Sequence, residues 1–183
     1  MGQFDFLIEQ SITDQLEEDT GPTSQLQVFA SKMAASARKG ACTDAAAFVQ
    51  VVSKAIYLRG AYRLQIGMSP AKQVALHDLK RVLVGDGWTR EGRNHGPFAL
   101  PANSFLDTGL KPAFRDGGNQ IQHAMAGIYL GFVFGFFAEK YVIWDEDSDV
   151  DKRLYRATFN IGNELKASQI INLPRMIMAD LCA

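Results

Sequence analysis

The sequence predicts an all-α protein, a compact bundle of about six or seven helices packed around one buried central helix. Three observations support this fold class. Apolar residues recur at helical intervals along most of the chain. Residues that begin or end helices separate these segments. One nearly uncharged segment, residues 119–140, has glycine at every fourth position in its centre.

Length and composition predict a globular chain, and we expect a single helical domain over residues 1–183. The chain has 183 residues, which is within the usual size of one domain. Apolar residues make up 47% and charged residues 21%, a balance that argues against disorder. The 19 basic and 20 acidic residues nearly cancel, so no overall field attracts nucleic acid or an anionic membrane.

The cysteines and the first residues bear on the compartment. Cys42 and Cys182 are too few for a disulfide framework and lack the paired spacing of a zinc site. We expect two thiols, and one bridge between them is the alternative. Asp5 and Glu9 stand where a secretory signal needs basic and then apolar residues, so we expect no signal peptide. The sequence leaves the compartment open, with the cytoplasm as the default.

The helices follow from apolar spacing and from the residues at their ends. We expect Ser24 and Thr43 to cap the second and third helices, and Pro70 to open the fourth at its first position. Gly40 and Gly85 are expected to end the second and fourth helices. Gly60 lies inside the apolar pattern of the third helix, where we expect it to allow close packing. The expected helices cover residues 4–18, 24–39, 44–66, 70–84, 119–140, 149–165 and 173–181.

The helical pattern disappears between the fourth and fifth helices. Residues 88–118 are rich in glycine, proline and asparagine, with aromatic residues among them. Connections longer than about 15 residues are uncommon in compact domains and often carry function. We therefore expect a long ordered loop over one end of the bundle.

The central helix resembles a membrane segment only in part. Gly127, Gly131 and Gly135 would form a smooth face that lets another helix approach closely, a pattern also used between helices in lipid. The uncharged stretch of residues 124–138 has only 15 residues, whereas a membrane span needs about 20. We expect a helix buried in a soluble core, and a membrane-inserting helical toxin is a minor alternative.

A polar cluster precedes the apolar part of this helix and is the candidate site. Asn119 and Gln120 lie four and three residues before His123, so all three share one helix face. A helix N-terminus offers free N–H groups to an anion, and histidine transfers protons near neutral pH. We expect His123 to act as acid or base, with Asp116 or Asp107 orienting its other ring nitrogen.

Four residues would bind the substrate of such a site, and a purely structural explanation competes with it. The expected substrate-binding residues are Asn119, Gln120, Arg115 and His95. Alternatively, Asn119 or Asp116 is only the N-cap and His123 pins the loop to the core, because buried polar groups must be paired in any protein. No G-x-S-x-G pattern surrounds Ser104, which argues against a serine triad.

The sequence does not predict a metal site or another cofactor. His77, His95 and His123 lack metal-ligand spacing, and we expect His77, which lies beside Asp78 in a surface helix, to be solvated. The acidic residues of segment 145–151 alternate like calcium ligands, but Val150 and Arg156 stand where such a loop needs glycine and glutamate. We expect Ser148 or Asp149 to cap a helix that starts there with a solvated acidic face, which could also dock a basic protein.

Two main functional hypotheses follow. The first is a hydrolase-type enzyme that acts on a small-molecule or polymer substrate at His123. The second is a non-catalytic helical protein that binds another protein, as a binding, inhibitory or effector protein. The long loop over the polar cluster favours the enzyme, and the acidic segment favours the interaction protein.

Overall fold

The computed structural model describes residues 20–60, 70–85, 96–135 and 148–183. Some of the expectations above fall outside these ranges. They are the helix at residues 4–18, residues 61–66 expected in the third helix, the first part of the loop with His95, residues 136–140 expected in the central helix, and residues 145–147 of the acidic segment.

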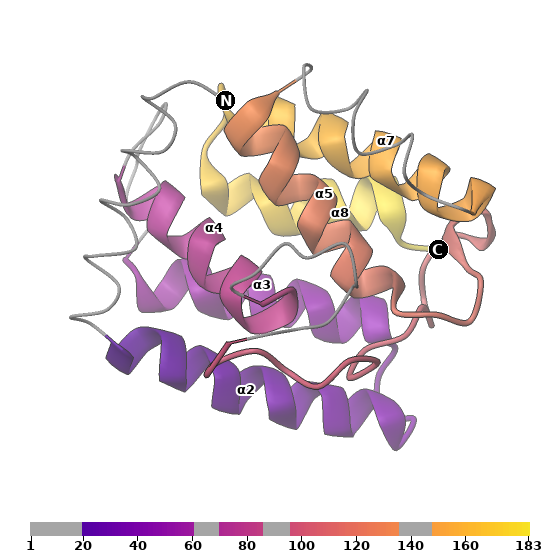
Figure 1. Cartoon of the computed structure of the whole chain (residues 1–183), viewed down its shortest axis with the longest axis horizontal. Helices are drawn as coiled ribbons and strands as arrows, with labels where there is room; N and C mark the ends of the chain where they lie inside the picture. Colours follow the sequence, from indigo (N-terminus) through magenta and orange to yellow (C-terminus); the bar gives the residue numbers. More distant parts are fainter. Residues whose placement is uncertain (1–19, 61–69, 86–95, 136–147) are drawn as a thin grey trace.

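The all-α prediction is confirmed, because the described residues form six α-helices, two short 3₁₀ turns and no β-strand. Figure 1 shows α2 along one side of the bundle and α7 along the opposite side, with the other helices between them. Helices α3 and α4 pack on α2, and α5 packs on both α4 and α7. The helices are α2 (Thr20–Arg38), α3 (Asp44–Leu58), α4 (Pro70–Leu83), α5 (Gln120–Phe134), α7 (Asp149–Leu165) and α8 (Leu173–Leu181), and the 3₁₀ turns are η1 (Pro112–Phe114) and η2 (Ile170–Asn172).

The central position predicted for the glycine-spaced helix is also confirmed. Almost every residue of α5 is buried, and its most extensive contact is with α7. A Cβ atom at Gly127 would collide with the Thr158 side chain, and one at Gly131 would lie 2.5 Å from the backbone oxygen of Phe159. Gly162 of α7 faces the α5 backbone just as closely. The glycines therefore let the two helix backbones approach each other.

Several predicted helix ends are confirmed by the capping contacts. Thr43 caps α3 by accepting a hydrogen bond from the Ala46 N–H, and Ser148 caps α7 by accepting from the N–H groups of Val150 and Asp151. Gly40 and Gly85 have φ angles of 73° and 104° just after α2 and α4. This left-handed region is open to glycine and unfavourable for most other residues, so both helices stop there.

Three predicted boundaries are wrong. Helix α2 begins at Thr20 rather than after Ser24, because a proline in the first turn (Pro22) gives up only an N–H that has no partner within the helix. Helix α3 ends at Leu58, and Gly60 has a φ of 61° with none of the described residues near the place where a side chain would point. Gly60 therefore follows the helix and is not the interior packing position that was expected. Helix α5 ends at Phe134, since Gly135 has a φ of 63°.

The predicted solvation of His77 is wrong, because His77 and its neighbour Asp78 are both buried. Their exposed fractions are 7% and 1%, and both lie on the inner side of α4. The Asp78 carboxylate accepts hydrogen bonds from the Arg59 guanidinium, at 2.6 Å from Nε, and from the Thr23 hydroxyl, at 2.9 Å. This buried ion pair joins α2, α3 and α4.

The described part of the long loop, residues 96–119, is ordered and touches much of the bundle. Figure 1 shows it passing between α2 and α4 and then turning toward the start of α5. Gln27 of α2 donates to the Pro97 carbonyl, and the Leu100 N–H donates to the Val82 carbonyl of α4. Leu110 then pairs with Cys182 in an isolated antiparallel bridge. These contacts place the end of the loop at the polar start of α5.

None of the helices in the described ranges combines the length and the apolar character that crossing a membrane requires.

Candidate functional site

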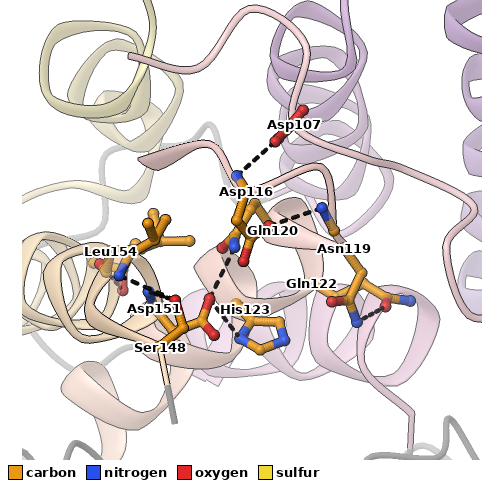
Figure 2. Close-up of polar contacts among 12 residues, drawn as sticks. Asp107, Asp116, Asn119, Gln120, Gln122, His123, Ser148, Asp151 and Leu154 are labelled. Atoms are coloured by element: carbon orange, nitrogen blue, oxygen red, sulfur yellow. Dashed lines mark hydrogen bonds and ion pairs between the residues drawn. The ribbon is translucent and has the colours of Figure 1, made fainter. Parts of the chain in front are cut away.

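The polar cluster lies where the first turn of α5 meets the first turn of α7, as Figure 2 shows. Helix α5 supplies Gln120 and His123, which share one face because they are three residues apart. Helix α7 supplies Asp151, in the turn that Ser148 caps. The close packing of the two helices at their glycines brings these side chains together.

His123 faces Asp151. The Nδ1 atom of His123 lies 3.6 Å from Asp151 Oδ1, and the exposed fractions of the two side chains are 24% and 12%. The Nδ1 atom is itself buried and makes no hydrogen bond, so the exposed part of the side chain lies elsewhere. A distance of 3.6 Å is too long for a hydrogen bond, yet a shift of a few tenths of an ångström would form one. The Tyr155 ring supports the imidazole with centroids 5.8 Å apart.

Gln120 holds the same carboxylate. Its Nε2 donates to Asp151 Oδ1 at 2.8 Å, and only 1% of the residue is exposed. Its Oε1 is buried and has no hydrogen-bond partner. Asp151 Oδ1 is therefore shared between one firm amide donor and the nearby imidazole.

The two aspartates expected to orient His123 make other contacts. Asp107 Oδ2 accepts hydrogen bonds from the N–H groups of Asp116 and Gly117, at 2.9 and 2.7 Å. Asp116 is exposed, and its Oδ1 accepts from the Gly118 N–H at 2.7 Å. The N–H groups of the glycine turn are therefore engaged by carboxylates of the chain itself, and an oxyanion would have to displace these carboxylates.

The expected substrate-binding residues are spread around this cluster. Asn119 is half-buried, and its Nδ2 donates to Gln122 Oε1 at 2.8 Å. Arg115 is exposed, and its Nε donates to the Leu110 carbonyl at 2.5 Å. His95 lies outside the described residues. Gln120 contacts Asp151 directly but is sealed from solvent.

The sequence interpretation missed Asp151, which it assigned to a solvated acidic face. That assignment is wrong for Asp151, whereas Asp149 is exposed, with 85% of its side chain accessible. A usable signal was present, since Asp151 lies three residues before Leu154 and seven before Thr158, on the buried stripe of α7. An acidic residue on a buried stripe needs a partner, and Gln120 and His123 are the polar residues of α5 that meet it.

In the part of the chain that the structure describes, no three His, Cys, Asp or Glu side chains cluster closely enough to bind a metal ion. Cys42 and Cys182 are free thiols. Burial raises the pKa of the Cys182 thiol, and the nearby Lys111 charge partly offsets this rise.

In comparisons with known proteins, no family model, curated protein or solved structure matches this chain significantly. Function must therefore be argued from the geometry of the cluster.

Proposed function

We propose that the cluster of His123, Asp151 and Gln120 is an acid–base site of a hydrolase-type enzyme. The observation that carries the proposal is the pairing of a part-exposed imidazole with an almost buried carboxylate, 3.6 Å from Nδ1 to Oδ1. An aspartate on one ring nitrogen holds the imidazole in the tautomer and orientation that let the other nitrogen accept a proton.

The proposed roles follow from which nitrogen is buried. Because Nδ1 is enclosed beside Asp151, Nε2 is the nitrogen through which the ring would take a proton from a water or substrate hydroxyl. At 3.6 Å the Asp151 carboxylate already favours a proton on Nδ1 of the free protein, and the contact can shorten to a hydrogen bond when substrate binds. Asp151 thus takes the orienting role first expected of Asp116 or Asp107.

Arg115 and Asn119 keep the substrate-binding roles expected of them, and Asp116 changes from an orienting residue to a substrate-binding one. Arg115 and Asp116 are exposed at the loop that precedes α5, and Asn119 is half-buried at the helix start. We propose that these side chains contact a small-molecule or polymer substrate. His95 joins them only as an expectation from the sequence.

The first test compares two aspartates on the same turn of α7. Asp151→Asn and His123→Gln should each lower the rate of hydrolysis by about 100-fold or more, since general acid–base groups typically contribute that much. Asp149→Asn is the matched control, because Asp149 is exposed and its recorded ion pair is with Lys152. Rates would be measured on chromogenic esters, amides, glycosides and phosphoesters.

The proposal is wrong if hydrolysis by the unchanged protein survives His123→Gln. It is also wrong if no substrate class is turned over and His123→Gln changes only the free energy of unfolding. The second result is what a purely structural junction between α5 and α7 predicts.

A second candidate function, a non-catalytic protein that binds a partner, is favoured by exposed residues outside the cluster. Ile171 and Met178 are about half exposed, at 51% and 50%, on η2 and α8. Asp149 keeps one exposed charge in the acidic segment, whose residues 145–147 lie outside the described ranges. On this hypothesis, reversing the charges of Asp145, Asp147 and Asp149 would weaken binding of a basic partner and reduce its salt dependence.

A further inference from the structure

Gln120 has a different place in the site from the one expected of a substrate-binding residue. Only 1% of it is exposed, so it offers a substrate almost no surface. The Nε2 of its side chain donates a hydrogen bond to Asp151 Oδ1, at 2.8 Å. The same Oδ1 atom faces His123 Nδ1. The amide therefore acts on the carboxylate rather than on a ligand.

The two ends of the Gln120 amide have different surroundings. An amide has a donor end and an acceptor end, and only the donor end can face a carboxylate. The other end, Oε1, is buried without a partner, which is an unfavourable arrangement for a polar atom. The contact with Asp151 is thus kept although the rest of the amide gains no hydrogen bond.

We infer that Gln120 is a positioning residue, whose amide holds Asp151 in the orientation that keeps the proton of neutral His123 on Nδ1. This inference rests on the proposed function for its catalytic meaning, but the tautomer of His123 can be measured without any substrate. Without the Nε2 donor, the Asp151 side chain can rotate about its own bonds, and Oδ1 no longer has a fixed place beside the imidazole.

The test replaces Gln120 by methionine, which has a similar length and no donor, and compares it with Gln122→Met. Gln122 is a matched control, since it is another buried amide of the same helix, 5% exposed, whose recorded side-chain contact is with Asn119. Long-range ¹⁵N correlation spectra distinguish the two tautomers of neutral histidine. We expect His123 to be mainly the Nδ1–H tautomer in the unchanged protein and in Gln122→Met.

In Gln120→Met we expect the two His123 tautomers to become similarly populated. Any hydrolysis should also slow by about tenfold or more, because small misplacements of a catalytic group are costly. Gln120→Leu is the second variant in case the first fails to fold, since it also removes the donor and adds no charge beside Asp151. Unchanged tautomer populations in the variant that folds would overturn the inference.

The two proposals fail in distinguishable ways. If Asp151→Asn abolishes hydrolysis but removing the Gln120 donor leaves the tautomer unchanged, the acid–base site stands and the role of Gln120 is wrong. If the tautomer responds to Gln120 but the protein hydrolyses nothing, the positioning stands and the enzyme hypothesis is wrong.

Discussion

A single lysine joins three helices. Lys72 of α4 is completely buried, and its Nζ donates to the carbonyls of Leu165 and Ser168, each at 2.6 Å. These carbonyls belong to the end of α7 and the turn after it, where a positive charge is favourable. The same Nζ lies 5.7 Å from the centre of the Phe132 ring of α5. Lys72 thus connects α4 with the two helices that form the candidate site.

Burial predicts how Lys72 affects stability. Desolvation lowers the pKa of its ammonium group below the usual 10.5, so the folded state binds this proton less readily than the unfolded state. The free energy of unfolding should therefore rise with pH between the lowered pKa and 10.5. Lys72→Met should remove this part of the pH dependence, whereas the exposed Lys32→Met should not. The free energy of unfolding would be measured in urea at several pH values from 7 upward. An equal dependence of this free energy on pH in the unchanged protein and in both variants would contradict the prediction.

At the scale of helices, the spacing of glycines has two different meanings in this chain. Gly127 and Gly131 lie inside α5 and permit contact with α7, whereas Gly135 has the same spacing and ends the helix. Spacing alone does not distinguish these cases, because an interior glycine and a terminal glycine differ in backbone conformation and in what lies opposite. The sequence therefore predicted the contact face correctly but extended the helix too far.

The two interior glycines should respond differently to a second substitution. Gly131→Ala should lower the free energy of unfolding by about 1–3 kcal/mol through overpacking, since the added Cβ meets the Phe159 backbone, which cannot be removed. Gly127→Ala should be similarly destabilising, but Thr158→Ala removes the hydroxyl it meets. Double-mutant cycles in urea should show partial rescue when Thr158→Ala is combined with Gly127→Ala, because the Cβ of residue 158 stays 2.9 Å from the added Cβ, and no rescue when it is combined with Gly131→Ala. Equal coupling energies of Thr158→Ala with Gly127→Ala and with Gly131→Ala would mean that the glycines do not define the contact of α5 with α7.

At the scale of the whole molecule, the loop of residues 96–119 ties distant helix ends together. Thr108 exchanges hydrogen bonds with the N-terminal turn of α3, through the N–H and carboxylate of Asp44. Lys111 donates from Nζ to the carbonyls of Ala179 and Asp180 at the end of α8, each at 2.8 Å. Asp107 then fixes the turn that leads into α5. The loop thus connects the start of α3, the end of α8 and the start of α5, and so sets the position of the candidate site.

We therefore expect Thr108→Val to weaken the attachment of the loop to α3, because valine has the shape of threonine but no hydroxyl. Losing the hydroxyl that bonds Asp44 should lower the free energy of unfolding by about 2 kcal/mol, the range for hydrogen bonds to charged groups. Hydrogen exchange should also accelerate at the amides of residues 108 to 111. Ser53→Ala, which removes an exposed hydroxyl bonded within its own helix, should change neither quantity. An unchanged exchange rate at these amides would show that Thr108 does not anchor the loop.

Much of the fold could be predicted because its signals are local. Helical spacing, the caps Thr43 and Ser148, and the glycines at 40 and 85 act through neighbouring residues and backbone conformation, which a sequence displays directly. The place of His123 at the front of a buried helix follows from the same local pattern. These features needed no knowledge of which helix packs on which.

The partners of the polar side chains depended on packing across the chain. Asp151 is 28 residues from His123, and Asp78 is 19 from Arg59, so no local rule pairs them. Each carboxylate is buried because another helix covers it, and it then takes whatever donors that helix presents. The sequence therefore located the histidine of the candidate site, whereas the contact of α5 with α7 supplied its carboxylate.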